Sequence, residues 1–177
     1  MKKLLFTLLF LGVASGCAGI LVEHETKRKP PDMSATYLVF PFRDPFYKKI
    51  TFPSVGTRFT RSFVSHCSSY GLRIKSVFNE AFSAAEDLDV ASALTYAQEA
   101  GADYIVTGMV TRWADSARDS AGLEIFVRKV PTGDVVFTTE IVQRNTFLMP
   151  GGPDEFVSSL SRALSREWLG LERYERK

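Results

Sequence analysis

The chain has 177 residues, of which 45% are hydrophobic and 24% are charged, and this balance predicts one globular domain of ordinary size. It excludes a collagen-like, mucin-like or broadly disordered chain. The 12 glycines and 8 prolines follow no repeating period, which argues against a solenoid or a propeller.

Residues 1–16 have the layout of a bacterial signal peptide. Two lysines after Met1 precede an apolar stretch over residues 4–13, which is too short to span a bilayer because a spanning helix needs about 20 apolar residues. Small residues then lead to a cysteine, in the order Ala14-Ser15-Gly16-Cys17. This order resembles the lipobox of bacterial lipoproteins, although Ala14 stands where leucine is commonest.

The resemblance implies that residues 1–16 are removed and that Cys17 carries the lipid. Two acyl chains already anchor a protein stably, so the mature chain is expected to be membrane-tethered without a transmembrane helix. Ala18 follows the cysteine and resembles the outer-membrane sorting signal of enterobacteria-like cells. We therefore predict a lipid-anchored protein of the outer membrane that faces the periplasm.

Loss of residues 1–16 also changes the charge. The full chain has 22 Lys and Arg against 20 Asp and Glu, and the leader holds two of the lysines and no acid, so the mature chain is formally neutral. Nucleic-acid binding depends on clustered positive charge and is not expected. With Cys17 lipidated, Cys67 is the one remaining thiol, which excludes an intramolecular disulfide.

Residues 17–34 are expected to form the lipidated cysteine and a flexible tether. Charged residues over 23–29 and the pair Pro30-Pro31 favour an extended, solvated path. At roughly 3 Å per residue, such a tether would lift the domain about 40 Å from the bilayer. The folded periplasmic domain is then expected over residues 35–177.

Within this domain the apolar patterns predict elements in the order β-α-β-α-β-β-β-α. Two-residue alternation and apolar runs predict strands at 37–40, 72–77, 104–111, 123–128 and 135–141. Helical spacing predicts helices at 53–70, from a cap at Asp87 or Asp89 to Gly101, and from Pro153 onward. Gly71 stands where the first helix should end, and Gly108 is expected to be a bend or a close-packing point.

Helical connections make the first three strands parallel if they share a sheet. The turn Pro131-Thr132-Gly133-Asp134 joins the last two strands in an antiparallel hairpin. The predicted fold class is therefore α/β, a single compact domain with a mixed sheet.

The residues offer no arrangement typical of catalysis or of metal binding. His66 and Cys67 are neighbours on a helix and point about 100° apart, so they do not form a nucleophile–base pair; Cys67 shares an apolar stripe with Phe59 and Phe63 and is expected to pack in the core. The other histidine, His24, lies in the tether, and no zinc-site spacing exists. We expect no catalytic residue, no metal and no cofactor.

Several polar loop residues are interpreted as structural. Arg43 and Asp44 are expected to form a surface ion pair, with a functional role as the alternative. Asp115 and Asp119 are turn residues without an evident partner. Residues 150–153, Pro-Gly-Gly-Pro, precede a helix, whose amides can hold an anion. Two prolines remove amide donors there, so this segment is interpreted as a turn.

Two segments carry a family likeness: residues 102–108 followed by Trp113-Ala114-Asp115, and the hairpin segment 130–136. With the lipobox and residues 37–41 they resemble a proteobacterial lipoprotein family of unknown function. The element order is similar to that of the curli secretion lipoprotein and of the amino-terminal domain of the Tol propeller protein. The resemblance implies assembly and protein contact and supplies no catalytic residue.

Two classes of function follow. The first is a non-enzymatic accessory or assembly factor that binds an envelope protein or its own copies. The second is a small-ligand binder or an enzyme whose site is built from scattered loop residues. For the first class, contacts are expected on strand 135–143, if it is outermost, and on the final helix, with Trp168 half-exposed; the alternative is that both complete the core.

Overall fold

The computed structural model describes residues 20–27, 30–47, 50–113, 120–144, 153–171 and 175–176. The strands are β1 Ile20–Lys27, β2 Thr36–Val39, β3 Phe46–Tyr47, β4 Ile50–Thr51, β5 Arg73–Ser76, β6 Tyr104–Arg112, β7 Ser120–Lys129, β8 Val135–Arg144 and β9 Glu175–Arg176. The helices are α1 Val55–Ser69, α2 Val90–Glu99 and α3 Pro153–Trp168. None of the helices within these ranges is long and apolar enough to cross a bilayer.

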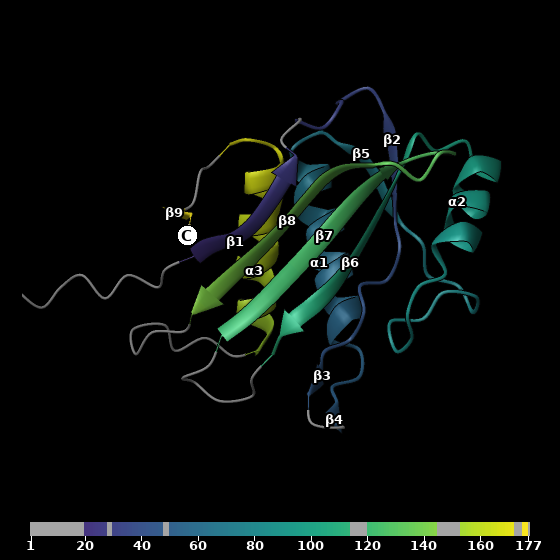
Figure 1. The fold of residues 1–177 in the computed structure, drawn as a ribbon. Coiled ribbons are helices and arrows are strands. Elements are labelled where there is room, and N and C mark those ends of the chain that lie inside the picture. Colours follow the sequence, from purple (N-terminus) through teal and green to yellow (C-terminus); the bar gives the residue numbers. More distant parts are fainter. Residues whose placement is uncertain are drawn as a thin grey trace, which may run out of the picture.

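Seven strands form one mixed sheet in the order β5-β2-β6-β7-β8-β1-β9, and β3 and β4 form a separate hairpin (Figure 1). Strands β5, β2 and β6 are parallel, because the helices α1 and α2 connect them. Strand β7 runs antiparallel to both β6 and β8. The predicted α/β class, the predicted order β-α-β-α-β-β-β-α and the mixed sheet are confirmed. The β3–β4 hairpin between β2 and α1 was not predicted.

The amino-terminal edge differs from the expectation. Residues 20–27, assigned to the tether on their charge, form β1, which pairs antiparallel with β8 from Ile20 opposite Gln143 to Lys27 opposite Thr138. Strand β8 therefore lies between β7 and β1, and the hypothesis that residues 135–143 form an open edge is wrong. Backbone pairing explains the difference, since it needs no apolar periodicity in the added strand.

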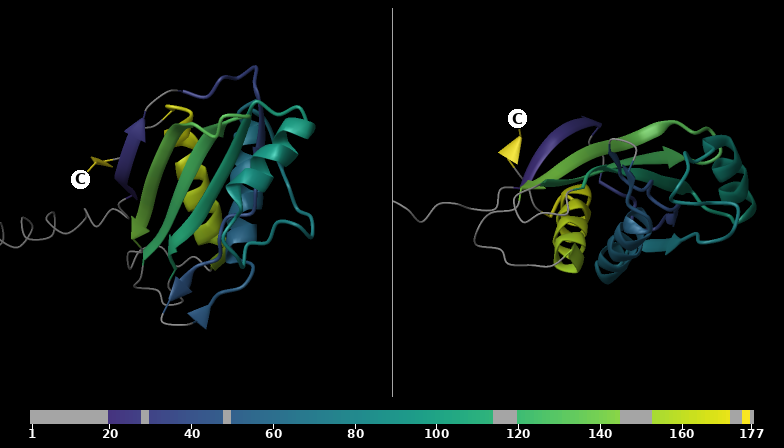
Figure 2. Two further views of the ribbon diagram at one scale, coloured as in Figure 1. Left: turned by 45° about the vertical axis from the view of Figure 1, so that its right-hand side comes forward. Right: turned by 90° about the horizontal axis from the view of Figure 1, so that it is seen from below.

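Helices α1 and α3 cover one face of the sheet (Figure 2). Phe59, Phe63 and Cys67 of α1 are fully buried there, as their spacing predicts. Gly71 follows α1 with φ +89°, a backbone conformation that ends a helix cheaply only at glycine. Trp168 of α3, expected to be half-exposed, is instead 2% exposed, because its ring packs 5.8 Å from that of Phe63.

Helix α2 lies on the opposite face. Alternate residues of a strand point to opposite faces, and Leu38 and Ile105 pack with Ala93 and Ala97 of α2 in a second, smaller core. Asp89 begins this helix, because its side chain accepts a hydrogen bond from the amide of Ala91. Of the two predicted caps, Asp89 is therefore the one in use.

Candidate functional site

The face of the sheet opposite α1 and α3 is only partly covered. Helix α2 packs on this face over β2 and β6, toward the edge of the sheet formed by β5 (Figure 2). No other helix of the described residues lies on this face. Across β6, β7 and β8 the registered residues of this face stand in rows. We call the two rows below the open face: Met109–Glu124–Glu140 and Thr107–Phe126–Thr138.

The open face mixes apolar and charged groups. Four residues of the open face are half-buried: Met109, Glu124, Phe126 and Glu140. A strand side chain that packs beneath a helix would be buried completely. Glu124 and Glu140 stand directly opposite each other, a like-charge pair that costs stability in an isolated sheet. The guanidinium of Arg128 lies 5.6 Å from the centre of the Phe126 ring. An aromatic ring beside an arginine is a frequent composition of protein-binding surfaces.

A pocket adjoins the open face where the chain enters α2. Its volume is about 160 Å³, and it is lined by Arg43, Asp87, Thr107, Met109, Phe126 and Arg128, among others. Arg43 and Asp87 form an ion pair of 2.6 Å at this site. Arg128 donates to the carbonyl of Gly133 over 3.3 Å, while its buried Nε has no hydrogen-bond partner. The pocket therefore has room and polar groups for waters or a small anion.

Asp44 has a structural role that its sequence context did not reveal. It is 6% exposed, and its carboxylate accepts hydrogen bonds from the amides of Ser54 (3.0 Å) and Gly56 (2.6 Å). Ser54 itself has φ 68° and makes no side-chain cap, so Asp44 satisfies the amino terminus of α1 from ten positions away. The prediction of an Arg43–Asp44 surface pair is wrong: Arg43 binds Asp87, and Asp44 is buried.

Cys67 is unsuited to nucleophilic chemistry. It is fully buried, and burial raises the pKa of its thiol to about 12, so the reactive thiolate is scarce at neutral pH. Its Sγ lies 3.4 Å from the hydroxyl of Ser165 on α3. For His66, burial and then Arg162 hold the pKa below its usual range. The prediction that Cys67 packs in the core is confirmed.

Several residues of the sequence analysis lie outside the described residues: Cys17, Ala18, Asp115, Asp119 and the segment 150–152. The side chain of His24 is likewise outside the description. Within the described ranges, no group of three or more His, Cys, Asp or Glu is placed to hold a metal ion.

The sequence did not predict the open face, because residues 123–128 were interpreted only as a strand of a hairpin. A signal for it does exist. Leu123, Ile125 and Val127 form one fully apolar set facing the helices, whereas the alternate positions are Glu124, Phe126 and Arg128. The alternate positions therefore place Phe126 between two charged residues on the side of the strand that faces away from the helices.

Comparison with known proteins identifies the fold. A scan against protein-family models finds none that matches this chain, and no curated protein matches it. Among solved structures, the PelC dodecamer from Paraburkholderia phytofirmans is similar, with a TM-score of 0.66 and 15% identity over 87% of this chain and 99% of that one. Lipoprotein GNA1162 from Neisseria meningitidis has a TM-score of 0.53 and 14% identity, over 75% of this chain and 96% of that one.

The TM-scores show a shared fold, and at identities of 14–15% the similarity shows the fold alone. The resemblance to bacterial lipoproteins is thereby confirmed at the level of the fold, since one of these structures is a bacterial lipoprotein. The finer resemblance, to a family of unknown function and to the curli and Tol domains, stays a prediction.

Proposed function

We propose that this protein is a lipid-anchored component of the cell envelope, held in the outer membrane through Cys17 and facing the periplasm. It acts as a non-enzymatic accessory or assembly factor through protein–protein contacts. Its partner is a second copy of the chain or another envelope protein. The observation that carries the proposal is the open face, with Met109, Glu124, Phe126 and Glu140 half-buried where no described helix covers them.

The composition of the open face supports contact with a protein. A partner with apolar side chains would bury Phe126, which is half-buried on the open face. Fold similarity to a protein that crystallised as a dodecamer makes self-association the first case to test. The inert state of Cys67 supports a role without nucleophilic chemistry.

The test is site-specific photo-crosslinking of the full-length protein in its own membrane. A photoreactive residue at position 126 is expected to give a crosslinked product, whereas one at Ser65, an exposed position on α1, is not. A product of twice the monomer mass would identify self-association. Absence of a product at 126, with products at 65 or elsewhere on the helices, would place the interface on the other face and refute the proposal.

The lipid anchor has its own test. Cys17→Ser is expected to abolish metabolic labelling with a fatty acid and to release the protein from the membrane fraction, because the thiol is the site of acylation. Fatty-acid labelling that persists in this variant would refute the assignment.

The pocket favours a second candidate, a binder of a small anionic ligand. Two arginines, Arg43 and Arg128, line it together with the acids Glu86 and Asp87. Arg43 is paired with Asp87, so the buried Nε of Arg128, which has no hydrogen-bond partner, is the donor that an anion would use. Thermal unfolding with inorganic phosphate and with acetate would test this case. A rise in the unfolding temperature that Arg128→Gln abolishes would support it, and no rise with either anion would remove it.

A further inference from the structure

The strand pairing places the start of the described chain at one end of the sheet. Ile20 of β1 pairs with Gln143 near the carboxyl end of β8, and Ala121 near the start of β7 also pairs with Gln143. Strand β6 ends at the same level, because Arg112 pairs with Gly122. The same end of the domain therefore holds Ile20 and the last residues of β6 and β8.

The β3–β4 hairpin projects from this same end. The chain leading into it runs beside β6, since Arg43 forms a parallel bridge with Met109 and the amide of Val110 donates to the carbonyl of Arg43. The hairpin then extends past the end of β6 (Figure 1). Strands β1 and β6 are three positions apart in the sheet, about 14 Å at the usual strand spacing.

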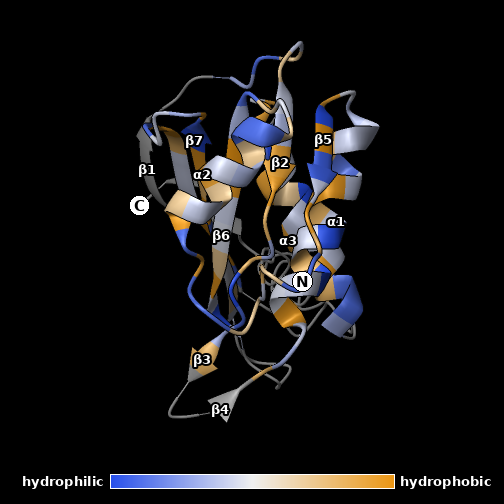
Figure 3. Cartoon of the chain, turned by 90° about the vertical axis from the view of Figure 1, so that its right-hand side faces the viewer, coloured by the Kyte–Doolittle hydropathy of each residue, from blue (hydrophilic) through white to orange (hydrophobic). Residues whose placement is uncertain are grey.

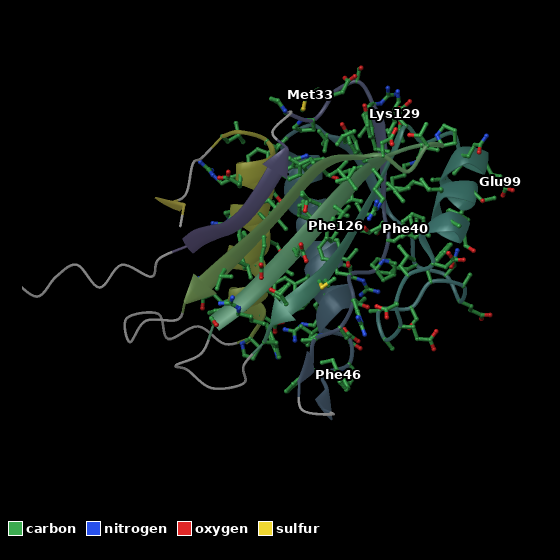
Figure 4. All side chains as sticks on the ribbon, viewed as in Figure 1. Met33, Phe40, Phe46, Glu99, Phe126 and Lys129 are labelled. Atoms are coloured by element: carbon green, nitrogen blue, oxygen red, sulfur yellow. The ribbon has the colours of Figure 1, made fainter. Side chains whose placement is uncertain are left out.

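The hairpin exposes an aromatic side chain at Phe46, the first residue of β3, which pairs with Thr51 of β4. Phe46 is 64% exposed, a larger fraction than for Met33, Phe78, Tyr96 or Leu171, the other exposed large hydrophobic residues described. Figure 3 shows β3 coloured as hydrophobic at the far end of the molecule. Figure 4 places Phe46 at one end and Met33 at the other. An isolated apolar side chain on a projection has no packing role inside the domain.

We propose that the β3–β4 hairpin is a second membrane contact and that Phe46 enters the interfacial layer of the bilayer that holds the lipid anchor. This inference rests on the proposed anchor at Cys17. Two residues lie between Cys17 and Ile20, and the three residue steps from one to the other span at most about 11 Å, so the end of the sheet that holds Ile20 faces the membrane. Segments that lie in the membrane interface place Phe, Trp and Leu side chains about 5–10 Å into the boundary between headgroups and acyl chains.

The short connection also replaces the long tether predicted from the sequence. A tether of about 40 Å would let the domain tumble freely, whereas β1 begins within about 11 Å of the anchor. The hairpin then supplies a second point of contact and limits rotation of the domain about the anchor. The opposite end of the sheet, with Met33, is held away from the bilayer.

The test uses fluorescent probes on the full-length lipidated protein in vesicles of phosphatidylethanolamine and phosphatidylglycerol. Phe46→Cys introduces a thiol for a polarity-sensitive dye, and Met33→Cys is the matched control, a 47% exposed apolar residue at the far end. Cys67 is fully buried and Cys17 is acylated, so neither takes the dye. The unsubstituted protein checks this, and mass spectrometry of the purified protein reports the anchor separately.

The expected result is a blue shift of the dye emission at position 46 and its quenching by lipids that carry a nitroxide near the headgroup. The dye at position 33 should show neither. An unshifted and unquenched dye at 46 on an anchored protein would overturn the hairpin contact while leaving the anchor intact. A blue shift without quenching would indicate a protein partner at the hairpin and would also overturn it. A protein without acyl chains would overturn the anchor, and with it this inference.

Discussion

Asp44→Ala is expected to destabilise the protein by about 2–3 kcal/mol. The carboxylate accepts two amide hydrogen bonds at the start of α1, from Ser54 and Gly56, and Asp44 is buried. Losing a helix cap costs typically about 1 kcal/mol, and hydrogen bonds to a charged acceptor contribute about 1.5–3 kcal/mol. The amide of Gly56 would remain buried without an acceptor, which places the total in the upper part of this range.

Asp154→Ala is the matched control. Asp154 also stands in the first turn of a helix, α3, and pairs with Arg58, but its side chain is 93% exposed. A solvent-exposed pair contributes typically about 0.2–1 kcal/mol, so its loss should cost at most about half of the Asp44 effect.

Urea unfolding followed by the fluorescence of Trp113 and Trp168 would measure both variants. The Asp44 variant should also lose about 4–12 °C of thermal midpoint, because 1 kcal/mol corresponds to about 2–4 °C in a domain of this size. Equal losses in the two variants would refute the reasoning, since burial would then make no difference. Asp44→Asn, which keeps one acceptor oxygen, should fall between the wild type and Asp44→Ala.

Three further predictions follow from single contacts. Cys67→Ala should cost on the order of 1 kcal/mol in urea unfolding, and the native thiol should resist labelling at neutral pH because burial raises its pKa to about 12; rapid labelling would contradict this. Gly108→Ala should cost about 1–3 kcal/mol in the same assay, because an added Cβ would lie 2.6 Å from the carbonyl oxygen of Glu124; an unchanged midpoint would count against the close contact. Burial and Arg162 lower the pKa of His66 in the folded protein. As the pH falls, the unfolded chain therefore binds a proton at His66 before the folded protein does, and the free energy of unfolding should decrease below about pH 6.5. His66→Gln should flatten this part of the stability profile, and an unchanged slope would exclude His66 as the cause of the decrease.

Local sequence patterns predict the α/β class and, apart from the β3–β4 hairpin, the strands and helices from β2 to α3. The strand at Tyr37–Phe40 and the stripe of Phe59 and Phe63 on α1 are local periodicities, and Gly71 is a local stop signal. Such patterns depend only on residues a few positions apart, so they can be interpreted without knowing what packs against them. The burial of Cys67 followed from the same stripe.

Contacts between residues far apart in the chain do not follow from these local patterns. Strand β1 exists through pairing with β8, more than a hundred positions away, and its charged sequence did not indicate a strand. Asp44 caps a helix that begins eleven residues later, and Trp168 is buried because Phe63 of another helix lies beside it. The open face depends on which strands α2 leaves uncovered. Strand pairing, side-chain burial and the covering of a sheet face each depend on two segments that come into contact. The residue pattern of one segment describes only that segment, so it does not predict what packs against it.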